Sequence, residues 1–143
     1  MKLTSYTDYT LRVLMYLALN DGKLATIQNI AQAYDISESH LTKVVHHLGK
    51  TSIIEALRGK GGGIRLARPA SEISIGKVVR EAEGESPIVE CLGSNGTCRI
   101  TPDCKLAGIL AKAVEAFYAT LDAYTLADLV AKPQALKQIL NLL

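Results

Sequence analysis

Apolar residues recur at intervals of three and four along most of the chain, which is the spacing that gives an α-helix one apolar face. In the first such stretch, Leu11, Leu14, Met15 and Ala18 keep this spacing and are expected to face inward. The pattern predicts helices over residues 6–19, 26–34, 38–50, 74–83 and 102–122, then two short helices that open near Thr125 and Pro133. Hydroxyl side chains suit the N-cap position, and four of these helices have one there: Thr26, Ser37, Ser74 and Thr101.

Between the third and fourth predicted helices the pattern becomes that of a β-hairpin. Residues 53–57 and 64–67 are strand-like and flank the sequence RGKGGG at 58–63. Because glycine accepts positive φ, this segment predicts a flexible tip that presents Arg58 and Lys60. A nucleotide-binding loop is the alternative, but the segment lacks the following helix and the Lys-Ser/Thr ending of that motif. The hairpin interpretation is therefore favoured.

Two short helices joined by a tight turn at Asp35 and Ile36 are typical of a helix-turn-helix. Small hydrogen-bonding and cationic groups on a recognition helix contact base edges and phosphates in a major groove, although any surface helix has a polar face. Here these groups are Ser37, Ser39, His40, Thr42, Lys43, His46 and His47. With the hairpin as a wing, the expected fold is mainly α with a small β-hairpin, a winged helix-turn-helix DNA-binding domain followed by a long helix.

Charge and composition narrow the class of protein further. Residues 1–80 carry 11 Lys and Arg against 6 Asp and Glu, whereas residues 81–143 carry 5 against 8. The first half is thus the candidate for a polyanionic partner. The sequence has no apolar run of about 18 residues that would span a membrane, and its opening MKLTSYTDYT lacks the features of an export signal. We expect a cytoplasmic protein without a membrane partner.

All three cysteines lie in one window, with six residues between Cys91 and Cys98 and five between Cys98 and Cys104. Clustered thiolates suit zinc, copper(I) or an iron–sulfur cluster, and three of them leave one coordination position for another ligand. One disulfide with a leftover thiol and three unrelated buried thiols are the other interpretations. Asp8 lies in the first turn of the first predicted helix, where a carboxylate is favoured without any metal.

The long predicted helix, with Thr101 as its N-cap and Pro102 as its first residue, has a continuous apolar stripe. Such a stripe packs on its own domain or pairs with a second copy of the chain. Since helix-turn-helix proteins usually bind DNA as dimers, a homodimer is expected. The stripe consists of Leu106, Ile109, Leu110, Ala113, Val114, Phe117 and Leu121.

In this order of elements the chain resembles the bacterial iron–sulfur winged-helix transcriptional regulators. The resemblance covers nearly the whole chain and is carried by LTSYTDYTLRVLMYLAL, IAQAYDISESHLTKVV, RGKGGGIRLARP, CRITPDCKL and YTLADLV. Within that family it is closer to the nitric-oxide-sensing branch, because Thr7-Asp8-Tyr9 matches it and no histidine directly follows Cys104. One departure is the sequence GKTSII, where a glycine is expected near Ser52.

The resemblance implies a homodimeric repressor that binds palindromic operator DNA. It implies an iron–sulfur cluster, most often [4Fe-4S], held by Cys91, Cys98, Cys104 and Asp8 of the partner subunit, whose reaction with nitric oxide releases the DNA. It also implies a winged helix-turn-helix domain at residues 1–82, a cluster-binding loop at 83–104, and a dimerisation helix with C-terminal helices packing back on the domain at 105–143.

Two alternatives stay open from the sequence. One is a [2Fe-2S] regulator that senses redox state or cluster supply. The other is a zinc-binding or disulfide-forming interaction protein without a DNA role. We expect no enzyme, because no nucleophile and base are arranged in a recognisable motif.

Overall fold

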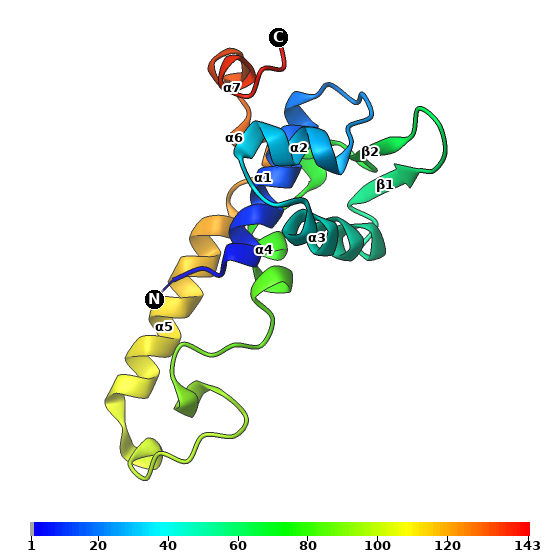
Figure 1. The fold of residues 1–143 in the computed structure, drawn as a ribbon. Helices are drawn as coiled ribbons and strands as arrows, with labels where there is room; N and C mark the ends of the chain where they lie inside the picture. Colours follow the sequence, from blue (N-terminus) through cyan, green and yellow to red (C-terminus); the bar gives the residue numbers. More distant parts are fainter. Residues whose placement is uncertain (1) are drawn as a thin grey trace.

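The computed structural model describes residues 2–143 and is mainly helical, with a single two-stranded sheet among them (Figure 1). Short 3₁₀ turns, η1, η2 and η3, lie at Ala70–Glu72, Glu90–Leu92 and Thr101–Asp103. The longer elements are α1 (Ser5–Leu19), α2 (Ile27–Tyr34), α3 (Glu38–Lys50), β1 (Ile54–Leu57), β2 (Gly63–Leu66), α4 (Ile75–Glu83), α5 (Lys105–Asp122), α6 (Leu126–Leu129) and α7 (Pro133–Ile139). The winged-helix fold expected from the sequence is confirmed.

Four helices begin at a hydroxyl residue whose side chain accepts a backbone N–H from the first turn. In α1 the cap is Thr4, which accepts from Thr7 at 3.2 Å. The predicted caps Thr26, Ser37 and Ser74 do the same for α2, α3 and α4. Each cap satisfies a donor that has no partner inside the helix. Local side-chain chemistry thus sets where these helices start, as the sequence predicted for α2, α3 and α4 but not for the Thr4 cap of α1.

The predicted start of the long helix is wrong. Thr101 donates its hydroxyl to the Cys98 carbonyl at 2.8 Å instead of capping a helix, and Thr101–Asp103 forms one 3₁₀ turn. Cys104 occupies the N-cap position of α5 with an extended backbone and no side-chain cap. A threonine hydroxyl that bonds a nearby carbonyl competes with capping, so α5 begins only at Lys105.

Helix α1 runs through the middle of the fold and is packed against α3, α4, α6, α7 and β2 (Figure 1). Leu14 is fully buried as expected, whereas Leu11, Met15 and Ala18 are only partly buried. Other residues of the helix complete the buried set: Thr7, Thr10, Val13, Tyr16, Leu17 and Leu19. The prediction of a single inward-facing stripe holds for a helix that packs on one side only, whereas α1 is packed on several sides. Each large apolar side chain buried this way contributes about 1.5–3 kcal/mol.

The wing is an antiparallel pair in which Ile54 faces Leu66 and Leu57 faces Gly63. Ile54 and Ile64 are buried and hold its base on the core, and Ile64 also pairs with Ala25. At the tip, a Cβ on Gly62 would lie 2.1 Å from the Leu57 carbonyl oxygen. The glycine-rich tip is therefore required by close packing of the backbone.

Ser52, just before β1, adopts a left-handed conformation with φ +59°. This is the place where the resemblance led us to expect a glycine. A left-handed backbone costs a residue with a Cβ about 1–2 kcal/mol. The turn keeps its shape although serine is strained in it.

Helix α5 projects away from the core together with the cysteine loop (Figure 1). None of its residues is buried, and Leu106 and Ile109 are 58% and 62% exposed. Its C-terminal end is joined to α4 by Arg80, which donates two hydrogen bonds to Asp122 at 2.6 and 2.8 Å and lies over the Tyr118 ring. The hydrogen bonds from Arg80 lower the pKa of Asp122. No helix within residues 2–143 is both long and apolar enough to cross a lipid bilayer.

Candidate functional site

The three cysteines occupy the segment that joins α4 to α5. Cys91 lies in the 3₁₀ turn η2, Cys98 is exposed in the following loop, and Cys104 is the N-cap of α5. All three are free thiols. Across residues 2–143 the structure brings no three His, Cys, Asp or Glu side chains within reach of one metal ion. A single chain therefore supplies the thiols without assembling them around a centre.

The loop nevertheless folds back on itself near Cys91. A Cβ placed on Gly96 would lie 2.7 Å from the Glu90 carbonyl oxygen and 3.0 Å from Cys91 Cα. This close approach of two backbones brings the turn that precedes Cys98 against Cys91. Three soft thiol donors carried on one loop fit an iron–sulfur cluster or zinc.

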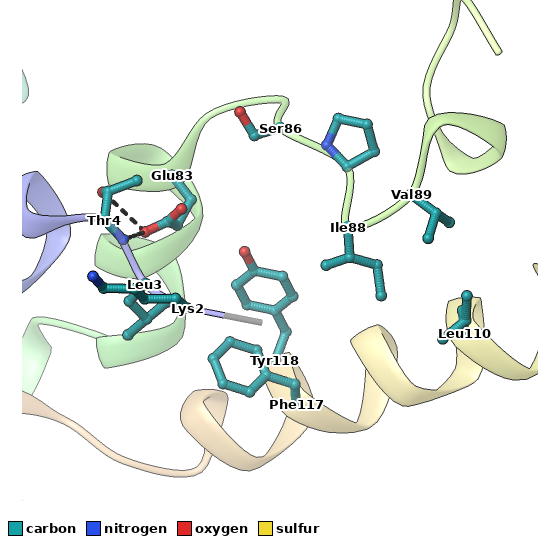
Figure 2. A pocket seen from close by; sticks show the side chains of 11 residues that line it. Lys2, Leu3, Thr4, Glu83, Ser86, Ile88, Val89, Leu110, Phe117 and Tyr118 are labelled. Atoms are coloured by element: carbon teal, nitrogen blue, oxygen red, sulfur yellow. Dashed lines mark hydrogen bonds between the residues drawn. The ribbon is translucent and has the colours of Figure 1, made fainter.

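A cavity of about 460 Å³ lies between the start of this loop and α5 (Figure 2), and a second cavity of about 410 Å³ lies beside the same two segments. Both have apolar walls from Pro87 and Ile88 on the loop and from Tyr118 on the helix, and Phe117 adds to the wall of the first. The start of the loop and the helix thus enclose open space, although the η2 turn contacts α5.

Asp8 lies far along the chain from the cysteines and pairs with Arg12 on its own helix. The Oδ2–Nη2 distance is 2.8 Å, and Arg12 Nε donates to Oδ1 at 3.2 Å. The Arg12 guanidinium also lies over the rings of Tyr9 and Tyr34. Burial raises the pKa of Tyr34 to about 12, and its hydroxyl donates to the Arg12 carbonyl at 2.9 Å. Both charged side chains of the pair are about half exposed, so the ion pair itself is weak.

Glu83, which the sequence analysis did not single out, joins α1 to the start of the cysteine loop (Figure 2). Its Oε1 accepts hydrogen bonds from the Thr7 hydroxyl at 2.6 Å, the Thr4 amide at 2.8 Å and the Thr4 hydroxyl at 3.1 Å. Burial opposes ionisation of Glu83, but these hydrogen bonds outweigh it and lower its pKa. The only local signal was its place as the last helical residue before Gly84.

The predicted DNA-binding residues lie on one side of α3 and at the wing tip. Ser39, His40, Thr42 and Lys43 are exposed, and Ser37 caps the helix by accepting the His40 amide. Arg58 and Lys60 are exposed at the tip of the hairpin, whose strand β1 packs beside α3 (Figure 1). The fold thus places the basic tip next to the recognition helix.

His46 is exposed, but the expectation of a surface role for His47 is wrong. The His47 ring packs edge-on against Tyr6, with 6.0 Å between ring centroids, and its Nε2 is buried without a hydrogen-bond partner among residues 2–143. His40 contacts Tyr9 with the same 6.0 Å between ring centroids, but the two ring planes are tilted by only 30°. Helix periodicity alone could not show that α1 covers this flank of α3.

Taken together, the capped helix pair, the basic wing and the projecting helix define a winged helix-turn-helix regulator. Residues 3–132 match the Rrf2 family, described as an iron-dependent transcriptional regulator, and the chain belongs to that family. Membership in this family confirms the expectation that the protein is a transcriptional regulator and not an enzyme.

Relatives extend the match over nearly the whole chain. The HTH-type transcriptional regulator NsrR of Geobacillus kaustophilus is 50% identical over 143 residues, which covers 99% of this chain and 97% of that protein. NsrR of Bacillus subtilis is 46% identical and covers 99% of both chains. The expected resemblance is therefore confirmed.

Solved structures agree on the fold. CymR, the global cysteine regulator of B. subtilis, superimposes with a TM-score of 0.70 at 26% identity and covers 92% of this chain and 97% of its own. T. potens IscR has a TM-score of 0.74 at 22% identity, over 96% and 91% of the two chains, and supports the fold alone.

Proposed function

We propose that this chain is a cytoplasmic, homodimeric transcriptional repressor that holds a [4Fe-4S] cluster and releases operator DNA when nitric oxide reacts with that cluster. The observation that carries the proposal is the loop with three free thiols, placed between the winged domain and a helix without a packing partner on its exposed face. Relatives named NsrR, at 46–50% identity, and the iron-dependent character of the family support it.

The cluster ligands in this proposal are Cys91, Cys98, Cys104 and Asp8 of the partner subunit. The fold-back of Gly96 onto Cys91, which brings the turn before Cys98 against Cys91, supports this ligand set. A carboxylate is a harder and weaker ligand for iron than a thiolate, so its position is the most labile. When bound, such a cluster supplies iron that reacts with nitric oxide.

Dimerisation is assigned to α5. Leu106 and Ile109 expose an apolar face that a second copy of the same helix would cover. Under this assignment residues 1–82 bind DNA, residues 83–104 hold the cluster, and residues 105–143 form the dimer and pack back on the domain. Two recognition helices of such a dimer fit half-sites about 34–36 Å apart.

The chain's own residues then connect signal and DNA. Asp8 exchanges its Arg12 partner for the cluster of the other subunit, which ties the first turn of α1 to the dimer. On the DNA, Ser37, Ser39, His40, Thr42 and Lys43 enter the major groove, while Arg58 and Lys60 contact phosphates or the minor groove. Coupling of about 1–3 kcal/mol between the two sites is sufficient for such a switch.

The first test is anaerobic purification, followed by iron and acid-labile sulfide assays and by DNA-binding measurements before and after nitric oxide. We expect about four irons and four sulfides per subunit, loss of the cluster spectrum with nitric oxide, and loss of operator affinity. Cys98→Ala should remove the cluster and leave a folded dimer, whereas Ser94→Ala in the same loop should retain it. Two irons per subunit would favour a [2Fe-2S] sensor, and zinc without sulfide would overturn the proposal.

A further inference from the structure

A pocket of about 350 Å³ lies between the first turns of α1 and the flank of α3, and four of its six lining residues are not among the predicted DNA contacts. Its lining residues come from only these two helices and are Ser5, Tyr6, Tyr9, His40, Lys43 and Val44. Val44 is buried and forms the floor, while Ser5, His40 and Lys43 are exposed at the rim. The pocket therefore opens beside the face of α3 that carries Ser39 and Thr42.

The polar groups of the residues that line this pocket are mainly hydrogen-bond donors, set beside apolar and aromatic surface. These residues carry three hydroxyls, an imidazole and an ammonium group, and no carboxylate is among them. In the part of the chain that the structure describes, neither the hydroxyls of Ser5, Tyr6 and Tyr9 nor the ammonium of Lys43 has a hydrogen-bond or ion-pair partner. Burial raises the pKa of Tyr6, so its hydroxyl keeps the proton that it would donate. Phosphate oxygens accept hydrogen bonds and carry negative charge, which makes them complementary to such a set.

The acidic residue of α1 does not make the pocket unfavourable for an anion. Asp8 belongs to the same turn as Tyr9, but its two oxygens are held by Arg12. Two further contacts join the walls of the pocket, because Tyr9 packs on His40 and Tyr6 packs on His47. The donors are thus carried on two helices that contact each other beside the pocket.

We infer that this pocket binds a phosphodiester group of the DNA backbone, at the edge of the major groove that α3 enters. The inference rests on the proposed DNA-binding function and adds α1 to the DNA interface. When Ser39 and Thr42 face the bases, the flank with His40 and Lys43 faces the sugar-phosphate wall of the groove. Lysine, serine and tyrosine side chains are common phosphate ligands in protein–DNA complexes.

The inference also gives α1 a second role. Tyr9 directly follows Asp8 in the sequence, so the helical turn proposed to carry the cluster ligand also carries a phosphate ligand. A shift of this turn relative to α3 would separate Ser5 and Tyr9 from His40 and Lys43. The phosphate contact would then be lost together with the cluster.

The test compares hydroxyl-deletion variants on two kinds of DNA. Tyr9→Phe and Ser5→Ala remove neutral donors, and we expect each to weaken binding about tenfold, because a hydrogen bond to a charged group is lost. The loss should be equal on a duplex selected by the wild-type protein from a random library and on an unrelated duplex, since phosphates are the same in both. The slope of log affinity against log salt should stay unchanged for these variants, whereas Lys43→Gln should reduce it by about 0.9 per subunit.

Matched controls are Tyr124→Phe and Ser71→Ala, which change an exposed tyrosine and an exposed serine outside the pocket. Methylphosphonate substitution, one phosphate at a time, would locate the contact. At one position per half-site, the wild-type protein should lose affinity and the Tyr9→Phe, Ser5→Ala double variant should lose no more.

Two outcomes would overturn the inference. One is wild-type affinity in both hydroxyl variants, and the other is a loss confined to the selected duplex, which would indicate a contact with bases. Failure of the wild-type protein to select any duplex would instead contradict the proposed function itself. Thermal unfolding of each variant separates loss of contact from loss of fold.

Discussion

The winged domain and the projecting arm of this molecule, which consists of the cysteine loop and α5, are built differently. In the domain, α1 alone buries seven side chains, and α2, α3 and α4 add others to the same core. In the arm, no residue of the 18-residue helix α5 is buried, and cavities lie between it and the start of the loop. The difference indicates that one chain buries enough surface to hold the winged domain together, whereas most of the arm's surface stays exposed in a single chain.

The strongest way to test this contrast is one substitution in each region. Leu14→Ala leaves a cavity in a fully buried site and should lower the free energy of unfolding by about 2–5 kcal/mol. Leu106→Ala, at a residue 58% exposed on α5, should change it by less than about 0.5 kcal/mol and weaken self-association instead. Urea denaturation measures the first effect and sedimentation velocity the second. Equal losses of stability in both variants would contradict the contrast.

The joint between the two regions should be sensitive to one methyl group. A Cβ on Gly76 of α4 would lie 1.8 Å from Asp122 Oδ1 and 3.0 Å from the Asp122 amide nitrogen. Because Arg80 holds that carboxylate in place, Gly76→Ala should destabilise the protein by about 1–3 kcal/mol. The control is Gly108→Ala, also in a helix but with nothing within 4 Å, which should stabilise by about 0.5–1 kcal/mol. A stabilising effect of both changes would show that the helices can separate freely.

The hydrogen bonds that Glu83 accepts from the start of α1 predict that the free energy of unfolding depends on pH. The pKa of Glu83 is lower in the folded protein than its ordinary value of 4.5, so the folded state favours the ionised form. Its contribution to stability is complete above that value and is lost as the pH falls through the folded pKa. Glu83→Gln should therefore cost about 1 kcal/mol near neutral pH, and the cost should shrink below about pH 4.5. Glu85→Gln, at an exposed neighbour, is the control, and a cost that does not depend on pH would argue against this role.

The smallest expected effect concerns Ser52. Glycine accepts its φ of +59° without strain, so Ser52→Gly should stabilise the protein by roughly 0.5–1 kcal/mol after the larger chain entropy of unfolded glycine is deducted. Thr51→Gly, at a right-handed residue next to it, should be destabilising. Thermal unfolding at one protein concentration compares the two. A loss of stability in Ser52→Gly would mean that the serine side chain holds the turn.

The predictions for the surface of α3 and for the inward face of α1 were wrong in part, for the same reason. His47 and the neighbouring positions of α3 looked like an open polar surface, yet the crossing of α1 over α3 covers one flank and creates the pocket at His40 and Lys43. In the same way, periodicity showed that α1 is amphipathic but not that several elements surround it. One helical stripe in a sequence implies one packing direction, and only the tertiary structure shows how many there are.

What the sequence by itself determined are the features set within a few residues. The bounds of α3, the caps of α2, α3 and α4, and the glycine-rich wing follow from side-chain hydrogen bonds and backbone preferences over three to five positions. The tertiary structure alone decided the contacts between distant segments. Glu83 meets Thr4 and Thr7 across 76 or more positions, and Tyr9 meets His40 across the α1–α3 crossing. These depend on the angles at which helices pack, which the spacing of residues along the chain does not specify.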